Sequence, residues 1–315
     1  MKYIKNTTDF TISENTAVSL GKFDGIHRGH KRLMESLKEK EKLGLKSVIF
    51  TFDISPKQRI EGHGFQKAIT TNAEKMHLFA QKGMDYMIEC PFTPELMRME
   101  PEDFVEKIVR QLHIKCFVVG TDFHYGYKGR GDYHLLKKLA DIYGYDVEVV
   151  DKVRENGRDI SSTYVREEIL AGRIETANHL LGYRYFVQGT VVHGNEIGRT
   201  IGVPTANLIP MADKLLPPFG VYVTRTFIGD KAQKRYGGIT NVGCKPTIAK
   251  EHAVGVETHL FDFDAQIYGE PIKVEFLKWV RSEKKFNSLE ELQQQMNHDI
   301  NYGINYLDTV KLQSE

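Results

Sequence analysis

Residues 17–30, AVSLGKFDGIHRGH, decide the fold of the first half of this chain. The apolar run Ala17–Leu20 predicts a short strand, a glycine-rich turn with His27 and His30 follows, and a helix is expected from Lys31 to Leu43. This order builds a phosphate site, because glycines let backbone N–H groups approach an anion and a helix start offers unpaired N–H donors. Two imidazoles one helical turn apart can donate to one phosphate chain. The segment therefore predicts a nucleoside triphosphate site that is neither a P-loop nor a dinucleotide-binding loop.

Two other interpretations of the histidine pair stay open at this point. His27 and His30 are three residues apart, which also fits a surface turn with two solvated histidines. A zinc site would need further His or Cys ligands at short spacings, and no third and fourth ligand lie close in the sequence. The glycines and Asp24 around the pair favour the phosphate site.

The segment resembles the G-x-F-D-G-x-H-x-G-H motif of the bifunctional riboflavin kinase/FMN adenylyltransferases, the prokaryotic FAD synthetases. At average residue usage, chance agreement with its fixed positions is on the order of 10⁻⁷ per position. The likeness extends from about Val18 to about Ile300. It implies that His27 and His30 bind the triphosphate of ATP and steady the leaving pyrophosphate. The other residues that it places in this site are Gly21, Phe23, Asp24, Gly25 and Gly29.

Composition and charge limit the class of protein. The chain has 315 residues, 41% of them hydrophobic, which suits two domains with proper cores. A formal net charge of +1 argues against a general nucleic-acid binder. Three cysteines, Cys90, Cys116 and Cys244, are far apart and odd in number, which favours a reducing cytoplasm over a disulfide framework. We see no signal-peptide core and no membrane-spanning run, so no membrane association is expected.

The first half alternates short apolar runs with amphipathic segments, which predicts a parallel sheet with helical crossovers. Strands are expected at 17–20, 47–52, 86–88, 116–119 and 147–150, and helices at 31–43, 73–82, 101–112 and 133–143. Ligands of such sheets lie at the carboxyl ends of the strands. The histidine motif and Gly120–Asp122 both follow strands and therefore belong at one rim. The family resemblance implies an α/β, Rossmann-like nucleotidyltransferase domain here.

The pattern changes after Gly182. Short strand-like runs recur at 186–192, 222–227, 238–242, 254–260 and 272–279, which indicates an antiparallel barrel or sandwich. A final helix is expected from Leu289 to Ile300, with Ser288 as its N-cap. The resemblance implies an antiparallel β-barrel riboflavin kinase domain with a terminal helix. We place the adenylyltransferase domain at residues 1–183 and the kinase domain at residues 184–315.

A second phosphate motif of the first half is ISSTYVR, at residues 160–166. The hydroxyls of Ser161, Ser162 and Thr163 precede a helix, where they can cap its start and also hold phosphate. Arg166 lies one turn into the helix and offers a fork of donors for phosphate oxygens. The segment resembles the family's S-S-T-x-[I/V]-R motif, which implies that Arg166 acts with the histidine pair in catalysis. Relatives commonly have Arg where this chain has Tyr164.

Two further segments of the first half are similar to the family. Asp122 belongs to a segment that resembles G-x-D-F-x-F-G, and the resemblance implies that it contacts the nucleotide or its metal. An ordinary turn is the alternative. In TFDISP, at residues 51–56, Asp53 stands where relatives have the Glu of F-E-P-x-P, and the first proline of that motif is missing. We assign no role to Asp53.

In the second half, a glycine-rich turn between strands ends in two oxygen-bearing side chains. Thr205 and Asn207 are two apart, so on a strand they share a face, and hard oxygen ligands on one face suit Mg²⁺ with its phosphates and waters. A plain hairpin is the alternative. The segment resembles the riboflavin kinase motif G-R-x-x-G-x-P-T-A-N, which assigns Thr205 and Asn207 to Mg-ATP. The residues expected to surround its phosphates are Gly194, Gly198, Arg199 and Gly202.

Glu257 is the candidate base of the kinase. Alternation in VETHL, at residues 256–260, puts Glu257 and His259 on one face, either solvated or inside the barrel mouth. The family's V-E-x-H segment has its catalytic glutamate here. Kinase chemistry needs that role, because the neutral 5′-hydroxyl of riboflavin must lose a proton as it attacks the γ-phosphorus. The resemblance also implies flavin-binding residues, although Ser282 replaces a usual proline; they are Asn241, Lys245, Thr247 and Arg281.

The sequence thus predicts one chain with two ATP-using activities. Riboflavin becomes FMN, and FMN becomes FAD with release of pyrophosphate. The FMN phosphate is already anionic, so adenylyl transfer needs alignment and charge neutralisation rather than a strong base. The expected ligands are riboflavin, FMN, ATP and Mg²⁺, with no nucleic-acid or membrane partner. Two alternatives stay open: a single retained activity with a weakened adenylyltransferase, or a flavin- and nucleotide-binding regulator without turnover.

Overall fold

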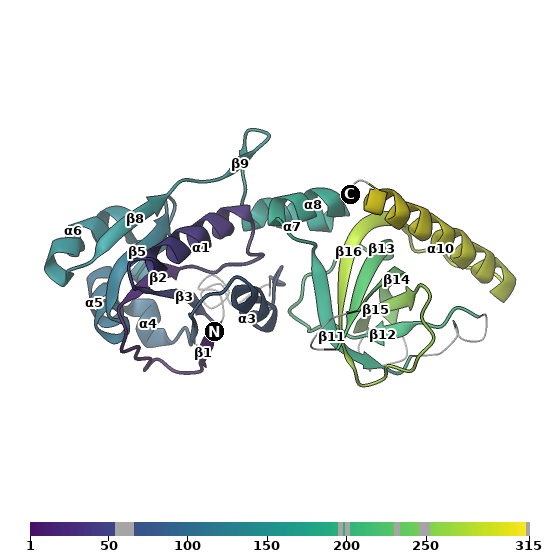
Figure 1. The fold of residues 1–315 in the computed structure, drawn as a ribbon, viewed down its shortest axis with the longest axis horizontal. Coiled ribbons are helices and arrows are strands. Elements are labelled where there is room, and N and C mark those ends of the chain that lie inside the picture. The colour runs from purple at the N-terminus through teal and green to yellow at the C-terminus, as the bar shows by residue number, and fades with distance from the viewer. Residues whose placement is uncertain (54–65, 195–197, 199–201, 230–233, 246–252, 313–315) are drawn as a thin grey trace. The chain divides into compact units, whose positions relative to one another are not determined.

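The computed structural model describes residues 1–53, 66–194, 198, 202–229, 234–245 and 253–312, with the backbone alone at positions 245, 253, 311 and 312. The chain divides into two compact units, Met1–Ser162 and Thr163–Glu315. Figure 1 shows a sheet with helices in the first unit, and a barrel with a long terminal helix in the second. Within the described ranges, no helix combines the length and the apolar character that crossing a membrane requires.

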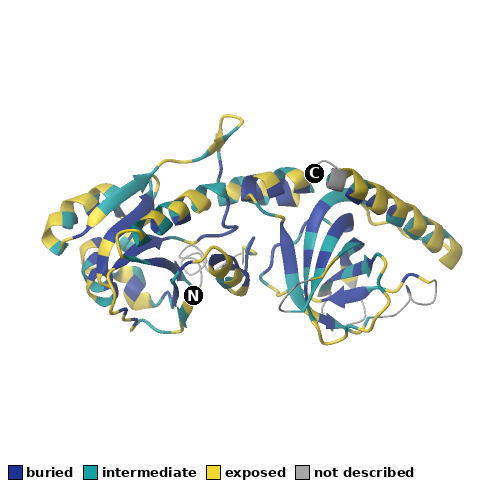
Figure 2. Ribbon diagram, viewed as in Figure 1, coloured by how far each residue is buried: buried dark blue, intermediate teal, exposed yellow. Residues whose placement is uncertain are grey.

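The first unit contains a six-stranded parallel sheet, which confirms the predicted Rossmann-like architecture. Its strands, in spatial order, are β1 (Lys2–Lys5), β4 (Tyr86–Cys90), β3 (Lys46–Phe52), β2 (Thr16–Leu20), β5 (Ile114–Gly120) and β8 (Asp146–Val150). Every residue of β2 and β4 is buried, as expected for a parallel sheet covered on both faces (Figure 2). The chain winds one way from β2 through β3 to β4, and the other way from β5 to β8. The switch point between β2 and β5 is where ligands of open α/β sheets bind.

Local sequence signals fix the ends of the helices in this unit. The helices are α1 (Arg28–Glu41), α3 (Asn72–Gln81), α4 (Pro94–Arg98), α5 (Pro101–Leu112) and α6 (Tyr133–Tyr143). Thr71 and Glu74 form a capping box at the start of α3. Asp132 caps α6, and Gly144 ends that helix in the left-handed conformation. The start of α1 at Arg28 corrects the predicted start at Lys31 and places His30 in the first turn of the helix. Two short hairpins complete the unit, β6 (His124–Tyr125) with β7 (Gly131–Asp132), and β9 (Arg154–Glu155) with β10 (Arg158–Asp159).

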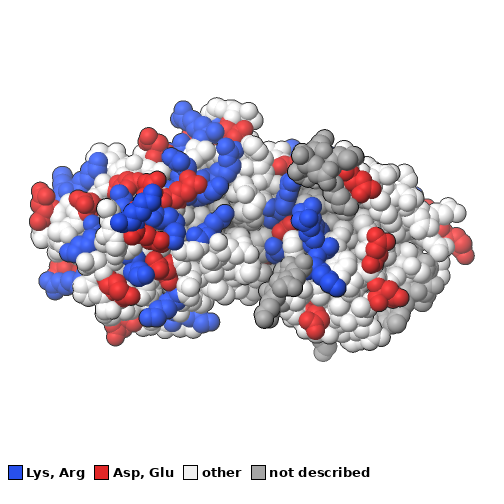
Figure 3. All heavy atoms as spheres, viewed as in Figure 1, with Lys and Arg blue, Asp and Glu red and all other residues white. Residues whose placement is uncertain are grey.

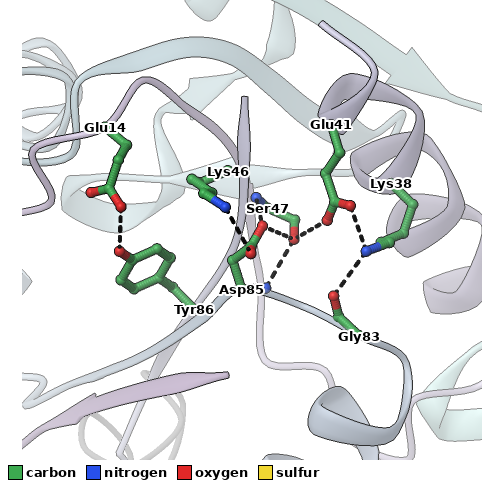
Figure 4. Close-up of polar contacts among 8 residues, drawn as sticks. All are labelled: Glu14, Lys38, Glu41, Lys46, Ser47, Gly83, Asp85 and Tyr86. Atoms are coloured by element: carbon green, nitrogen blue, oxygen red, sulfur yellow. Dashed lines mark hydrogen bonds and ion pairs between the residues drawn. The ribbon is translucent and has the colours of Figure 1, made fainter. Parts of the chain in front are cut away.

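A polar cluster joins α1, β3 and β4 at the amino ends of the two strands (Figure 4). Ser47 is fully buried, and its hydroxyl lies 2.7 Å from the Glu41 carboxylate and 3.1 Å from that of Asp85. Ser47 N donates to the Asp85 carboxylate at 3.0 Å, and Asp85 N donates to Ser47 Oγ at 3.0 Å. Lys38 and Lys46 contact the same two carboxylates. The cluster lies at the amino ends of the strands, whereas the histidine motif follows the carboxyl end of β2. It therefore stabilises the fold without taking part in the site.

The second unit is a closed antiparallel barrel, which confirms the barrel over the sandwich. Its strands, in order around the barrel, are β11 (Phe186–Val192), β12 (Ala206–Leu208), β15 (Ala253–Leu260), β14 (Arg235–Lys245), β13 (Gly220–Ile228) and β16 (Pro271–Ser282). On β15, Val256, Thr258 and Leu260 are buried, whereas Glu257 and His259 are partly exposed, which matches the predicted alternation (Figure 2). Because the buried residues fill the barrel, Glu257 lies on its outer, accessible side.

Helices accompany the barrel in the second unit. They are α7 (Ser162–Leu170), which starts at the unit boundary, α8 (Ile174–Leu181) and α10 (Leu289–Leu312). Leu307 of α10 packs against Val223 and Leu277 of the barrel. Ser288 Oγ accepts a hydrogen bond from Glu291 N at 3.1 Å and caps α10 as predicted. The predicted end of this helix at Ile300 is wrong, because the helix continues to Leu312.

Candidate active sites

The histidine motif leaves β2 through a loop with unusual backbone angles. Gly25 and Ile26 have φ of +82° and +39°, a region that β-branched residues rarely adopt. Asp24 holds this loop in place, since its carboxylate accepts hydrogen bonds from Ile69 N at 2.8 Å and from Thr70 N at 3.3 Å. Only 1% of Asp24 is exposed. The structure therefore gives Asp24 a supporting place under the loop, and its contact with ATP stays a prediction.

His27 and His30 lie together at the start of α1, where His27 is the N-cap residue. Their rings stack with centroids 3.8 Å apart, and the Nδ1 atoms of both are buried without a hydrogen-bond partner among the described residues. Burial lowers the pKa of His27 to about 4. Burial, with the charges of His27 and Lys75, lowers the pKa of His30 well below its usual range. Both imidazoles are therefore neutral near pH 7, and each can donate one hydrogen bond to a phosphate.

Aromatic packing and a glycine fix the position of the two rings. The centroid of the Phe23 ring lies 5.1 Å from that of His30 and 5.6 Å from that of Phe79 on α3. A Cβ atom on Gly29 would lie 3.1 Å from the His27 ring, closer than most real contacts. Glycine at this position therefore lets the imidazole lie directly against the first turn of α1.

The second phosphate motif begins beside the first. Ser162 Oγ donates a hydrogen bond to Asp24 O at 2.8 Å, which ties the last residue of the first unit to the histidine loop. Ser161, directly before it, is half-buried. Thr163 and Arg166 follow on α7 in the second unit, and their phosphate contacts stay predictions.

Asp122 follows β5, on the other side of the switch point. Its carboxylate lies 3.1 Å from Lys152 Nζ, which is also 3.4 Å from the carboxylate of Asp159. The negative charge of Asp122 acts on His27 and raises the pKa of that ring, against the larger effect of burial. The Asp122 side chain is 69% exposed and therefore accessible to a ligand. The strand order brings Asp122 and the histidines to one rim, and its contact with a nucleotide or metal stays a prediction.

An aromatic cavity of about 480 Å³ opens at the same rim, and the sequence did not predict it, although Phe52 and Phe123 of its walls belong to the two further segments that resemble the family. Its walls include Phe52, Phe92, Phe123 and Tyr125, with Gly21 at its edge. The Phe52 and Phe92 rings lie 4.8 Å apart, and the rings of Phe123 and Tyr125 stack at 5.4 Å. The signal in the sequence that could have predicted this cavity was the aromatic residues at the carboxyl ends of β3 and β5, because parallel strands bring the residues that follow them to one rim of the sheet.

The candidate kinase centre lies on three neighbouring strands of the barrel. Glu257 of β15 is paired with Asn207 of β12 on one side and with Asn241 of β14 on the other. Thr205 Oγ1 donates a 2.5 Å hydrogen bond to Glu257 Oε1. A Cβ atom on Gly194 would lie 2.4 Å from Asn207 Nδ2, so glycine lets the chain pass close to this amide. Residues far apart in the sequence thus meet at one place on the barrel.

The oxygen atoms at this centre fit Mg²⁺. Asn207 is 4% exposed, and its Oδ1 atom has no hydrogen-bond partner among the described residues. Thr205 lines the same cavity as Asn207 and adds a hydroxyl oxygen. Mg²⁺ takes one or two protein ligands and completes its shell with phosphate and water oxygens. In the described parts of the chain, no three or more His, Cys, Asp or Glu side chains gather as a metal site.

Two cavities of the second unit share Thr205 as a lining residue. The first, of about 440 Å³, is also lined by Asn207 and by Tyr268, whose ring stacks on His193 at 3.8 Å. The second, of about 540 Å³, contains Glu257. The two cavities therefore adjoin at Thr205, whose hydroxyl contacts Glu257 in the second one. Other residues around the second cavity are Gly198, Asn241, Arg281, Phe286 and Met296.

Arg281, a predicted flavin contact, is held by α10. Its Nε and Nη2 atoms donate to Asp299 Oδ2 at 3.0 and 2.7 Å, and Asp299 is 2% exposed. Asn241 Nδ2 donates to the Glu283 carboxylate at 3.3 Å. The flavin contacts of Arg281 and Asn241 stay predictions. Among the remaining predicted positions, the structure describes neither Arg199 nor Thr247 nor residues 54–56. It describes Lys245 by the backbone alone. Gly202 is exposed and has a φ of +76°.

Comparison with known proteins assigns both halves of the chain. A family model described as FAD synthetase matches residues 9–164, and one described as riboflavin kinase matches residues 181–307. A bifunctional riboflavin kinase/FMN adenylyltransferase of Listeria monocytogenes is 36% identical over 295 residues, 93% of each chain. One of Bacillus subtilis is 33% identical over 302 residues, 94% of each chain. A crystal structure from Streptococcus pneumoniae, described as a macrolide-efflux protein, is 31% identical with a TM-score of 0.86, over 96% of this chain and 98% of that one.

Proposed function

The chain belongs to the family of bifunctional riboflavin kinase/FMN adenylyltransferases, and we propose that residues 1–183 form its adenylyltransferase domain and residues 184–315 its kinase domain. It is a bifunctional enzyme of flavin cofactor synthesis: ATP phosphorylates riboflavin to FMN, and a second ATP adenylylates FMN to FAD with release of pyrophosphate. The matches at residues 9–164 and 181–307 support the proposed division.

Glu257 is the proposed general base of the kinase. The observation that supports it most strongly is its place in the second cavity, where Thr205, which lines both cavities, has its Oγ1 atom 2.5 Å from the Glu257 carboxylate. The cavity of Asn207 would hold ATP, and the cavity of Glu257 would hold riboflavin. Glu257 then takes the proton of the ribityl hydroxyl as this oxygen attacks the γ-phosphorus.

Thr205 and Asn207 are the proposed metal ligands of the kinase, because they offer oxygen atoms in one cavity and Asn207 Oδ1 is buried there. When bound, Mg²⁺ would neutralise charge on the β- and γ-phosphates. Gly194 and Gly198 keep the chain close to this centre, and Gly202 with Arg199 is expected to contact the phosphates. The flavin contacts that we propose are Asn241, Lys245, Thr247 and Arg281.

The histidine site is the proposed place of adenylyl transfer. The FMN phosphate attacks the α-phosphorus of ATP, and pyrophosphate leaves. Neutral His27 and His30 donate hydrogen bonds to the triphosphate, and the N–H groups at the start of α1 add further donors. We assign phosphate contacts to the second motif as well, with Arg166 as its cation. The full set at this site is Gly21, Phe23, Asp24, Gly25, Gly29, Asp122, Ser161, Ser162, Thr163 and Arg166.

The aromatic cavity beside this site is the proposed place of the flavin ring of FMN. Its volume and its walls suit a flat apolar ring system, because aromatic side chains such as Phe52 and Phe123 offer faces for stacking. Its position next to Gly21 would direct the FMN phosphate toward the histidine loop.

The proposed partners are small molecules in the cytoplasm, where ATP and Mg²⁺ are available and free cysteines stay reduced. Basic and acidic side chains are interspersed over the face of the first unit seen in Figure 3. This mixture supports the expectation of small anionic ligands rather than nucleic acid.

Glu257→Gln tests the kinase assignment. We expect the rate of FMN formation from riboflavin to fall by roughly 10²–10⁴-fold, because the amide cannot accept the proton. FAD formation from supplied FMN should be retained, since it takes place in the other unit. Chromatography of the flavin products measures both, and Glu270→Gln, an exposed carboxylate of the same unit, is the matched control. An unchanged kinase rate would remove Glu257 from its role.

A further inference from the structure

The second cavity of the barrel unit follows a row of paired residues on four neighbouring strands. Glu257 of β15 is paired with Asn241 of β14. Asn241 is paired in turn with Val221 of β13, which is paired with Arg281 of β16. All four line this cavity. Neighbouring strands lie about 4.8 Å apart, so three steps separate Glu257 and Arg281 by roughly 14 Å along the sheet. The candidate base and the arginine are therefore at the two ends of the row.

Helix α10 supplies a further wall of the same cavity. The residues of α10 that line it are Leu292, Met296, Asp299 and Ile300. Asp299 is the one carboxylate among these four, and it is only 2% exposed. A buried carboxylate needs a cation and hydrogen-bond donors. Asp299 has both, because it pairs with Arg281 and its Oδ1 accepts a hydrogen bond from Gln295 Nε2 at 3.0 Å.

Asp299 fixes the direction of the Arg281 side chain. Arg281 Nε lies 3.1 and 3.0 Å from the two Asp299 oxygens, and Nη2 donates to Oδ2 at 2.7 Å. Nη1 donates to Ser282 O at 3.0 Å. A guanidinium has five N–H donors, so Nη1 and Nη2 each keep one that makes no hydrogen bond within the described ranges. Because Arg281 lines the cavity, these two donors are available to a ligand there.

We propose that Asp299 is a positioning residue of the riboflavin site, which aims the two remaining donors of Arg281 at the polar edge of the flavin ring. The proposal rests on the proposed assignment of this cavity to riboflavin. With the ribityl hydroxyl at Glu257, the ring takes up the rest of the cavity, whose other end is Arg281. The oxygen and nitrogen acceptors of its polar edge match two N–H groups of one guanidinium. Without the carboxylate, the long arginine side chain would have many rotamers to choose from.

The test compares Asp299→Asn, Arg281→Met, the double variant and Glu175→Gln in the full-length chain. Asparagine keeps the shape of aspartate but loses the charge that holds Arg281. Glu175→Gln is the matched control, because that carboxylate binds another cation of β16, Lys278 at 2.8 Å, and does not line this cavity. Equilibrium dialysis measures the Kd for riboflavin, and FMN formation gives kcat and KM for ATP.

We expect Asp299→Asn to weaken riboflavin binding by about tenfold, because hydrogen bonds from a charged donor are lost. The kcat at saturating riboflavin and the KM for ATP should change little, since Glu257 and Asn207 are untouched. The double variant should bind riboflavin no more weakly than Arg281→Met alone, because Asp299 acts through Arg281. Glu175→Gln should bind riboflavin as the unmodified chain does.

Two results would overturn the proposal. One is unchanged riboflavin binding by Asp299→Asn. The other is a further loss of binding in the double variant together with a raised KM for ATP, which indicates that Asp299 only holds α10 on the barrel. FAD formation from supplied FMN shows that the first unit is intact. If the unmodified chain binds riboflavin but forms no FMN, the proposed role of Glu257 fails, and the dialysis still tests Asp299.

Discussion

At the scale of single residues, burial decides what the histidine pair can do. His27 and His30 stack on each other and have their Nδ1 atoms buried, so the neutral form of each ring is favoured. Two neutral imidazoles can lie 3.8 Å apart without charge repulsion. In the proposed adenylyl transfer, such a pair would align the triphosphate by hydrogen bonds and leave charge neutralisation to other groups.

This neutrality predicts how stability depends on pH. The pKa of His27 is about 4 in the folded chain and 6.5 as its ordinary value, so the unfolded chain binds more protons between these values. Stability due to His27 is therefore complete above about pH 6.5 and is lost as the pH falls toward 4. Between pH 7 and pH 5 we expect His27 alone to lower the free energy of unfolding of the first unit by about 2 kcal/mol.

The effect is measured by urea unfolding at the two pH values, with hydrogen exchange of the amides of β2 and β5 as the probe of unfolding. Replacing both histidines by Gln should remove it, and His134→Gln, at an exposed position on α6, should not. An identical pH dependence in the double variant and the unmodified chain would show that the pair is not held neutral.

Residue types and spacing predicted much of both sites but not all. The i, i+3 spacing of His27 and His30 predicts neighbouring rings, and strand alternation predicts that Glu257 and His259 share a face. The aromatic cavity was not predictable in this way. Its walls depend on which loops the sheet order brings together, and a single phenylalanine has no local pattern that reports such a contact.

At the scale of elements, the Ser47 cluster holds α1, β3 and β4 together (Figure 4). Ser47→Ala would leave Asp85 N without its acceptor and two carboxylates without a shared donor. We expect the free energy of unfolding of the first unit to fall by about 1–3 kcal/mol, with the kinetic constants of both activities unchanged. Hydrogen exchange of β3 and β4 in urea measures the loss. Ser13→Ala, which removes an exposed hydroxyl, is the control; equal stability of the two variants would contradict the account.

Element ends were harder to predict where tertiary packing overrides local preference. Gly303 has a low helix propensity, yet α10 continues through it. Glycine is needed at this position because a Cβ atom would lie 2.8 Å from Ile239 and 2.9 Å from Phe261. Gly29 likewise lies within a helix despite its low helix propensity, because the His27 ring at the start of α1 occupies the space that a side chain would need. Strand β1 was missed since Lys2–Lys5 has lysines at both ends and little apolar character, as is common in edge strands.

At the scale of the whole molecule, α8 precedes the proposed kinase domain, residues 184–315, but packs against its barrel within the second compact unit. Its Asn178 donates to Phe276 O at 2.9 Å and accepts from Tyr185 N at 2.6 Å. Ile174, Ala177, Leu180 and Leu181 are all nearly inaccessible to solvent. A kinase fragment that starts at Tyr183 should therefore be less stable than one that starts at Thr163, by roughly 4–6 kcal/mol.

Unfolding of the two fragments in urea is followed by the fluorescence of Trp279, the only tryptophan of the chain, which packs against Tyr222. Riboflavin kinase activity of each fragment reports whether the barrel is native. Equal midpoints for both fragments would mean that α8 adds nothing to the stability of the barrel.

The central claim is that each half of the chain has its own ATP site, and equilibrium binding of a non-hydrolysable ATP analogue with Mg²⁺ tests it most directly. We predict two sites per chain, of which His27→Ala with His30→Ala removes one and Asn207→Ala removes the other. A single site in the unmodified chain, or the loss of the same site in both variants, would contradict the account.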